Sequence, residues 1–219
     1  HLLSMDAQSL CVSCHEDVGK NAKNAKHPHD PAKSDCLKCH TPHASNQAKV
    51  LKQPVQELCA SCHQKTVDSA AHAKHTHGAL TDGKACMNCH VAHGSEFDKQ
   101  LSQDPIASCL QCHAKPIEVS KERVVKGVPE IGMANLHKHG AIEKGDCSGC
   151  HTVHGGQLDR LLVANYNNSF YQPYTEQAYE LCFKCHSKEL VMGNTDDPQT
   201  RFRDGTRNLH AIHVASDKN

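Results

Sequence analysis

The sequence is poor in the residues that build an ordinary hydrophobic core. Its 219 residues include no tryptophan, only 4% aromatic residues and 37% apolar residues, and the mean hydropathy is −0.61. A chain of this length would normally bury a core of its own side chains. Either part of the chain is disordered, or something other than side chains fills the interior.

Two further absences narrow the function. Lys+Arg and Asp+Glu both number 24, and no basic stripe is present to bind nucleic acid. The longest purely apolar runs, such as residues 161–164, fall far short of the roughly 20 residues that a membrane-spanning helix needs. The sequence starts at His1 rather than Met and shows no leader, so we expect that a secretory signal has been removed.

Cysteine and histidine, in contrast, are abundant. All 14 cysteines fall into seven copies of C-x-x-C-H, with none left over. We number these copies motifs 1 to 7 along the chain: Cys11, Cys14 and His15; Cys36, Cys39 and His40; Cys59, Cys62 and His63; Cys86, Cys89 and His90; Cys109, Cys112 and His113; Cys147, Cys150 and His151; Cys182, Cys185 and His186.

The motif C-x-x-C-H is the attachment signal for c-type haem. Positions i, i+3 and i+4 of a helical turn share one face, so two thiols can form thioethers with the haem vinyl groups while the histidine coordinates the iron. Structural zinc gives no reason for a histidine after every second cysteine, and disulfides need no fixed spacing. We therefore predict seven covalent haems c, with the motif histidines as proximal iron ligands.

The motifs alternate between two types. Motifs 1, 3, 5 and 7 (first-type) follow a leucine or a similar segment, as in "SLCVSCH", whereas motifs 2, 4 and 6 (second-type) follow a polar turn, as in "KSDCLKCHTPH". This alternation predicts a two-haem repeat with a period of about 50 residues, stretched in the C-terminal half. We expect one domain, 1–219, with three and a half repeats over about 1–50, 51–100, 101–160 and 161–219.

Most of the histidines outside the motifs are in register with them. One row, the trailing histidines, closes the second-type motifs, and a second row, the upstream histidines, precedes them or follows motif 7. The trailing histidines are His43, His93 and His154, and the upstream histidines are His29, His77, His139 and His213. Together they supply one further histidine for each haem, so we predict that they are the distal ligands.

The reach of each row suggests its partners. A trailing histidine lies too close to its own proximal histidine to reach the far face of that haem, so we expect it to ligate a neighbouring haem. Spacing from the preceding first-type motif assigns His213 to motif 7. A third row competes with the upstream histidines for the same role: His27, His75, His137 and His210.

These motifs resemble the doubled C-x-x-C-H multihaem cytochromes c, from "SLCVSCH" to "NLHAIHV". The resemblance implies an exported electron-transfer protein with bis-histidine haems, periplasmic or extracellular, from a Gram-negative bacterium. It implies other redox proteins, copies of the chain, an outer-membrane porin or an extracellular metal oxide as partners. In the family pattern another second-type unit would follow "NLHAIHVASDKN".

We expect a mostly irregular fold of short α-helices, with little or no sheet, a haem core and an elongated haem chain. Two imidazoles on each iron leave no open position, which favours a low-potential electron carrier over an enzyme. The alternative is a multihaem reductase of nitrogen or sulfur oxyanions, which would need an iron with an open position. A filament of copies is also left open, because a head-to-tail interface that does not close gives a fibre.

Overall fold

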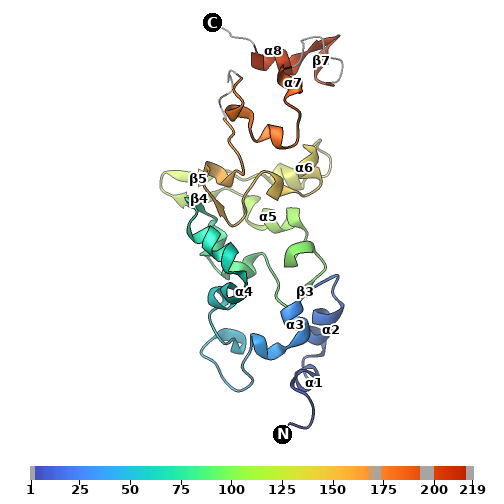
Figure 1. Ribbon diagram of the computed structural model, residues 1–219, viewed down its shortest axis with the longest axis vertical. Coiled ribbons are helices and arrows are strands. Elements are labelled where there is room, and N and C mark those ends of the chain that lie inside the picture. The colour runs from blue at the N-terminus through green and yellow to red at the C-terminus, as the bar shows by residue number, and fades with distance from the viewer. Residues whose placement is uncertain (1–2, 168, 170–173, 193–199, 216–219) are drawn as a thin grey trace.

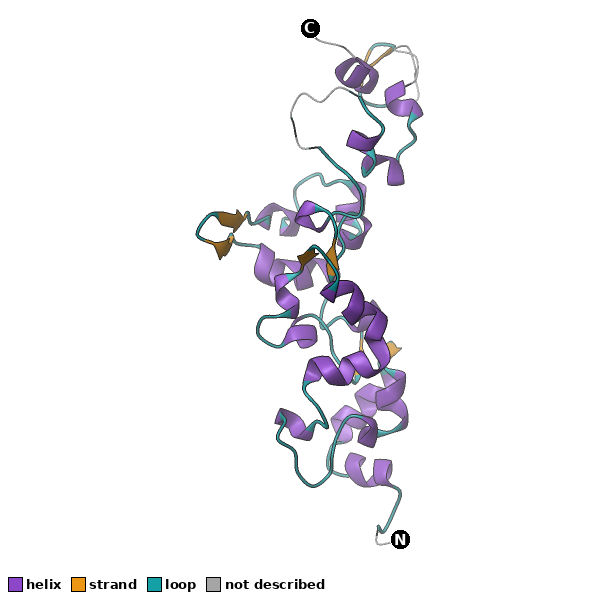
Figure 2. Cartoon of the chain, turned by 60° about the vertical axis from the view of Figure 1, so that its left-hand side comes forward, coloured by secondary structure: helices purple, strands orange, loops and turns teal. Residues whose placement is uncertain are grey.

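The computed structural model describes residues 3–167, 169, 174–192 and 200–215. These residues form a long and narrow column with the two ends of the chain at its opposite ends, in both ribbon views (Figures 1 and 2). The colours of Figure 1 follow one another along the long axis. The repeats are therefore stacked in chain order.

Short helices and irregular loops make up most of the described chain, which confirms that part of the predicted fold class. The α-helices are α1 (Ala7–Val12), α2 (Glu16–Asn24), α3 (Asp30–Ser34), α4 (Val55–Ala71), α5 (Pro105–His113), α6 (Gly140–Glu143), α7 (Glu189–Met192) and α8 (Leu209–Ala215). The 3₁₀ helices are η1 (Cys36–Lys38), η2 (Ala48–Val50), η3 (Gly78–Leu80), η4 (Ala85–Asn88), η5 (Asp98–Gln100), η6 (Pro129–Gly132), η7 (Cys147–Gly149), η8 (Asp159–Leu161), η9 (Gln177–Tyr179) and η10 (Cys182–Lys184).

The strands are short and form only two-stranded sheets. They are β1 (His27–Pro28), β2 (His75–Thr76), β3 (Gly94–Ser95), β4 (Ile117–Ser120), β5 (Arg123–Val125), β6 (Gly155–Gly156), β7 (Arg203–Asp204) and β8 (Arg207–Asn208). The antiparallel pairs are β1–β3, β2–β6, β4–β5 and β7–β8. The expectation of little sheet therefore holds for the described residues, although two of these pairs prove to position the site.

The two motif types are built on different local structures, except that first-type motif 7 lies on the 3₁₀ turn η10 as second-type motifs lie on such turns. First-type motifs 1, 3 and 5 lie on α-helices, and the helix breaks at the proximal histidine, with φ −109° at His15 and −105° at His63. Asp104 starts α5 by accepting hydrogen bonds from the backbone N–H groups of Ile106 and Ala107, with Pro105 in the first turn. Second-type motifs lie on the 3₁₀ turns η1, η4 and η7.

Two sheets tie distant segments together in the N-terminal part of the column. In β1–β3, Pro28 pairs with Gly94, and in β2–β6, Thr76 pairs with Gly155. A Cβ atom at Gly94 would lie 2.7 Å from the carbonyl oxygen of Asn21 at the end of α2. Glycine is therefore required where the strand touches the preceding helix.

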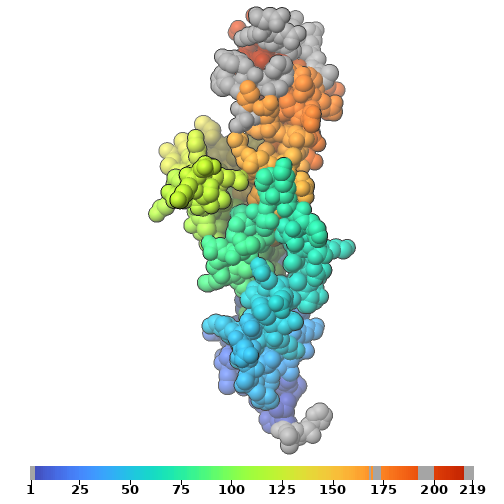
Figure 3. Space-filling view, turned by 90° about the vertical axis from the view of Figure 1, so that its left-hand side faces the viewer, coloured from blue at the N-terminus to red at the C-terminus, as the bar shows by residue number. Residues whose placement is uncertain are grey.

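The C-terminal part uses local hairpins instead. The β4–β5 hairpin follows α5 and projects sideways from the column, as Figures 1 and 3 show. It stands where the earlier repeats have a second helix, namely α2 after motif 1 and the second half of α4 after motif 3. The β7–β8 hairpin leads into α8 near the C-terminal end.

Side chains provide no continuous core among the described residues. The buried apolar residues are all alanines: Ala22, Ala25, Ala70, Ala164 and Ala211. The accessible surface is 15923 Å², whereas a compact protein of the same mass would expose about 9,900 Å². This excess agrees with the shortage of core-forming residues in the composition.

Within the described ranges, no helix has the length and apolar character that crossing a membrane requires.

Candidate haem-binding sites

The fourteen cysteines are all free thiols, and those of successive motifs lie close together. The first cysteine of a first-type motif and that of the second-type motif after it lie close enough for one thiol to raise the pKa of the other: Cys11 beside Cys36, Cys86 beside Cys59 and Cys147 beside Cys109. The second cysteines interact at the next junction: Cys39 with Cys62, Cys89 with Cys112 and Cys150 with Cys185. The seven motifs therefore form one unbranched series in chain order.

Burial and these neighbours favour the neutral form of several of the thiols by raising their pKa. Burial, reinforced by the Cys86 thiol, raises the pKa of Cys59 to about 11. Burial and the Cys147 thiol likewise raise the pKa of Cys109 to about 12. Desolvation disfavours a thiolate in the same way at other cysteines along the series.

Five proximal histidines face a second imidazole. The ring centres of each pair are 5.8–6.3 Å apart, and in four of the pairs the ring planes lie within 25° of parallel. The pairs are His63 with His29, His40 with His93, His113 with His77, His90 with His154 and His186 with His139. They serve motifs 3, 2, 5, 4 and 7 respectively.

This separation fits an iron between the two rings. An imidazole–metal bond of about 2.0–2.1 Å, with the ring centre about 1.1 Å beyond the nitrogen, places two opposed ring centres about 6.3 Å apart. The two thiols of the same motif precede each of these proximal histidines in the sequence. The residues present therefore fit a covalently attached, bis-histidine haem at these five motifs.

A carbonyl oxygen orients the proximal ring at every second-type motif. The Nδ1 atoms of His40, His90 and His151 each lie 2.9 Å from a backbone carbonyl oxygen nine residues further along. Such a hydrogen bond fixes the tautomer and leaves Nε2 free for a metal. His151 is thus arranged like the other two, although no second ring faces it among the described residues.

The loop that supplies this carbonyl was missed in the sequence analysis. Its turn places Lys49, Lys99 and Arg160 at φ of 60°, 56° and 56°, in the left-handed region. Isolated bridges then join His40 to Leu51, His90 to Leu101 and His151 to Leu162. The signal was present as a basic residue nine positions, and a leucine eleven positions, after each second-type proximal histidine.

The upstream histidines pair forward along the chain. His29, His77 and His139 each face the next first-type motif rather than the one before them. Spacing from the preceding motif, which assigned His213 to motif 7, is therefore not what pairs these rings. The chain passes through second-type motif 6 between His139 and the next first-type histidine, His186. The rings of His139 and His186 therefore lie opposite each other across one intervening motif.

The trailing histidines pair backward. His93 faces motif 2 and His154 faces motif 4, each two motifs before its own position. Burial, and then the facing imidazole, lower the pKa of His93 and His154. Neutral imidazoles are the form that binds a metal.

The sheets hold the two rows beside each other. The Nδ1 atom of His29 lies 2.7 Å from the carbonyl oxygen of Ala92, immediately before His93. The backbone N–H of His77 donates to the carbonyl oxygen of His154 at 3.4 Å. Each trailing histidine therefore stands next to the upstream histidine that serves the intervening first-type motif.

The third row has other neighbours. Nδ1 of His27 is 3.9 Å from a carboxylate oxygen of Asp98, and His75 is part of strand β2. Among the described residues, no ring contact joins His27, His75 or His137 to a proximal histidine. His210 packs against Phe202, with ring centres 4.9 Å apart, and burial and the proximity of His186 lower the pKa of His210.

Four in-register histidines have no facing imidazole in the described part of the chain. Two are proximal, His15 of motif 1 and His151 of motif 6. The others are His43 and His213; the His213 ring lies 5.7 Å from Phe202, and its Nδ1 is 2.6 Å from the carbonyl oxygen of Leu209. At two of the predicted haem sites only the proximal histidine is in place. Two of the predicted distal ligands face no proximal histidine.

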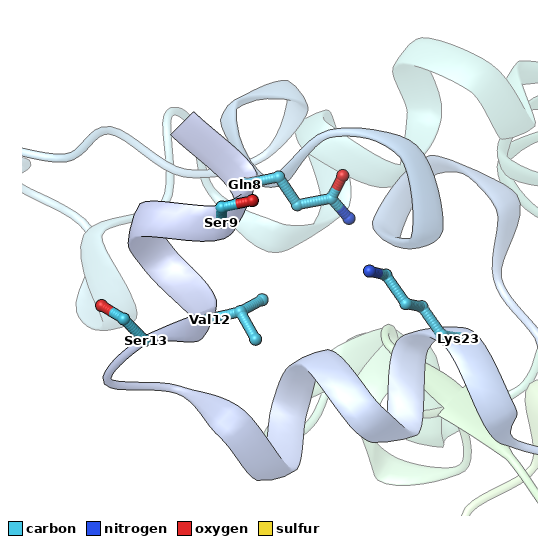
Figure 4. A pocket seen from close by; sticks show the side chains of 5 residues that line it. All are labelled: Gln8, Ser9, Val12, Ser13 and Lys23. Carbon is cyan, nitrogen blue, oxygen red and sulfur yellow. The ribbon is translucent and has the colours of Figure 1, made fainter. Parts of the chain in front are cut away.

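The described residues offer little support for a separate metal-ion site or a small-molecule site. In the ranges that the structure describes, no group of three or more His, Cys, Asp or Glu side chains is arranged to hold a metal ion. A groove of about 300 Å³ lies between α1 and α2, where Gln8 and Lys23 point toward each other above Val12 (Figure 4). Most of its lining is polar, unlike the apolar lining of a typical small-molecule site.

Comparison with known proteins gives one family. The model of the doubled CXXCH motif matches residues 29–68, 77–118 and 139–190, more than half of the chain. Each match begins at an upstream histidine and ends just after the first-type motif that this histidine faces. The matched units thus have a different phase from the predicted repeats, and motif 1 lies outside them. None of the curated proteins compared matches the chain.

Proposed function

The chain belongs to the doubled CXXCH motif family of multihaem c-type cytochromes, and we propose that it conducts electrons along seven covalently bound haems c. The five imidazole pairs carry this proposal. They provide two histidines for an iron at motifs 2, 3, 4, 5 and 7. When bound, each haem supplies an iron that takes up and releases one electron.

The residues around these irons suit electron transfer rather than substrate chemistry. The two facing imidazoles would both bind an iron held between them and would leave no position for a substrate. Carbonyl oxygens hold several of the rings through Nδ1, so ligand geometry changes little between redox states. Histidine also lacks the potential-raising effect of a methionine ligand, so we expect low potentials.

The order of the motifs supplies the route. The cysteine thiols of successive motifs lie near one another in an unbroken series from motif 1 to motif 7, close enough to raise one another's pKa. Haems attached to these cysteines would be near neighbours in the same order. We propose that electrons enter and leave near the two ends of this column and pass through the motifs in chain order.

His213 is the proposed distal ligand of motif 6. The second-type motifs 2 and 4 receive their distal histidine from beyond the next first-type motif. The corresponding region for motif 6 lies beyond motif 7, where α8 carries His213. Its hydrogen-bonded Nδ1 leaves Nε2 available for an iron.

The proposed setting is the periplasm or cell exterior, with electron exchange between other redox proteins, a porin complex, copies of the chain or a metal oxide. The resemblance to exported multihaem cytochromes supports this setting. Propionates would make the loaded protein negatively charged, since the side chains alone sum to zero. A basic protein surface or a metal oxide is therefore a suitable partner.

A haem count and a spin-state measurement test the proposal. Pyridine haemochrome absorbance per chain is expected to give seven haems, and electron paramagnetic resonance of the oxidised protein is expected to show low-spin irons at the five paired motifs. Fewer than five low-spin haems would contradict the bis-histidine assignment. A dominant high-spin signal with turnover of nitrite or a sulfur oxyanion would favour the reductase instead.

A further inference from the structure

Motif 1 stands apart from the other first-type motifs. It lies outside the three family matches, and no described imidazole faces His15. Motifs 3, 5 and 7 each receive an upstream histidine. The source of the second ligand at motif 1 must therefore differ from the rule that the rest of the column follows.

The placement of the trailing histidines indicates that source. His93 follows motif 4 and lies close to His29, which faces motif 3. His154 follows motif 6 and lies close to His77, which faces motif 5. A trailing histidine thus stands on the distal side of the first-type motif immediately before its own. The same relation would put His43 on the distal side of motif 1.

Motifs 1 and 2 are also packed together. Helix α1, which carries Cys11 of motif 1, packs against η1, which carries Cys36 of motif 2. The loop after motif 2 has the same internal bond as its counterpart, since Ser45 donates to the carbonyl oxygen of Leu51 as Ser95 does to that of Leu101. The loop that contains His43 is thus built like the loop that contains His93.

His43 differs from the other trailing histidines in the residue that follows it. Gly94 and Gly155 follow His93 and His154, and a Cβ atom there would lie 2.7 Å from Asn21 in α2 and 2.9 Å from Ala73, just after α4. Ala44 follows His43, and its segment has no strand partner among the described residues. The close glycine contact and strand pairing that accompany His93 and His154 are therefore missing at His43.

We propose that His43 is the distal ligand of the motif 1 haem in the same chain. This inference rests on the proposed haem loading. His43 is exposed and faces no other described imidazole, whereas His93 and His154 are half-buried in their pairs. An iron held at motif 1 would then have no free position for a small ligand, which suits electron exchange.

The test compares three single variants of the loaded protein. His43→Ala is expected to convert one of the seven haems from low spin to high spin by electron paramagnetic resonance and resonance Raman spectroscopy. Added imidazole should restore the low-spin signal, and carbon monoxide should bind one reduced haem. His72→Ala is the matched control, because His72 is exposed and bonds through Nδ1 to the carbonyl oxygen of Asp68. It should leave all spectra unchanged.

His93→Ala separates the inference from the proposed function, since it should produce the same one-haem change at motif 2. A change with His93→Ala but none with His43→Ala overturns the His43 assignment and leaves the proposed function intact. No change with either variant overturns both. A high-spin haem already present in the wild type and unaffected by His43→Ala also overturns the assignment, as does a wild-type low-spin signal at motif 1 that is lost on dilution.

Should His43→Ala load poorly with haem, His43→Met keeps an axial ligand. It should raise the reduction potential of one haem while all seven remain low-spin. An unchanged set of potentials in this variant counts against His43 as a ligand.

Discussion

The N-terminal and C-terminal parts of the column carry the same motifs but are held together differently. In the N-terminal part, β1–β3 and β2–β6 join segments that are far apart in sequence. In the C-terminal part, β4–β5 and β7–β8 are hairpins between adjacent strands. The first part is therefore crossed by long-range pairings, and the second is a succession of local ones.

The histidine pairs follow the same division. The proximal histidines of motifs 2 and 4 face an imidazole from downstream, and those of motifs 3 and 5 face one from upstream, so ring pairs link the chain in both directions. At motif 7 the described pair is His139 with His186, and its ring planes are tilted by 44°. An iron in the first part would join interleaved segments, whereas an iron at motif 7 would close a single loop.

Removing one haem from each part should give the largest difference. Replacing Cys86 and Cys89 by Ser removes the motif 4 haem, which would link His90 to His154 across β2–β6. Loss of such a cross-link is expected to cost about 2–5 kcal/mol of unfolding free energy, by analogy with a disulfide that closes a long loop. Thermal unfolding followed by circular dichroism measures it.

The matched variant replaces Cys182 and Cys185 by Ser at motif 7. It should lower the unfolding temperature less than the motif 4 variant, and limited proteolysis should cut it only near the C-terminal end. Equal destabilisation by the two double variants would contradict the division between interleaved and local parts.

A smaller effect is expected where strand and helix touch. Gly94→Ala places a Cβ atom 2.9 Å from that of Ala25 and still closer to the backbone of Asn21. Overpacking of this kind costs about 1–3 kcal/mol. Chemical denaturation should detect the loss, and the motif 2 haem should become partly high-spin as His93 is displaced.

Gly140→Ala is its control in the C-terminal part. A Cβ atom there has no neighbour within 4 Å, and alanine in a helix reduces the entropy of the unfolded chain. This variant is expected to be neutral or slightly stabilising. Loss of stability comparable to that of Gly94→Ala would mean that the close approach at β3 is not the cause.

The sequence alone was sufficient for the parts that depend on local chemistry. Spacing within C-x-x-C-H predicted where the thiols and proximal histidines lie, and the shortage of large apolar residues predicted that side chains would form no core. Short helices followed from the same local patterns. None of these conclusions requires knowledge of which segments meet in space.

The sequence alone did not predict which segments pair over long distances. Spacing from the preceding first-type motif, which assigned His213 to motif 7, does not describe the other upstream histidines: beside the antiparallel pair β1–β3, His29 faces motif 3. Two-residue strands leave too little pattern to recognise. The glycines after His93 and His154 were the available clue, since their need for close backbone contact implies a partner that the local sequence does not show.

The smallest expected effect concerns the tie between the β4–β5 hairpin and the column. Arg123 reaches Asp159 at 3.3 Å, next to the turn whose carbonyl orients His151. Both side chains are more than half exposed, so the pair should contribute only about 0.2–1 kcal/mol, and less at high salt. Arg123→Ala should therefore shift the denaturation midpoint slightly at low salt and not at 1 M salt. Lys121→Ala, on the same hairpin, is the control and should change nothing at either salt concentration. A larger, salt-independent loss with Arg123→Ala would show that the hairpin is packed into the column as firmly as the crossed strands are.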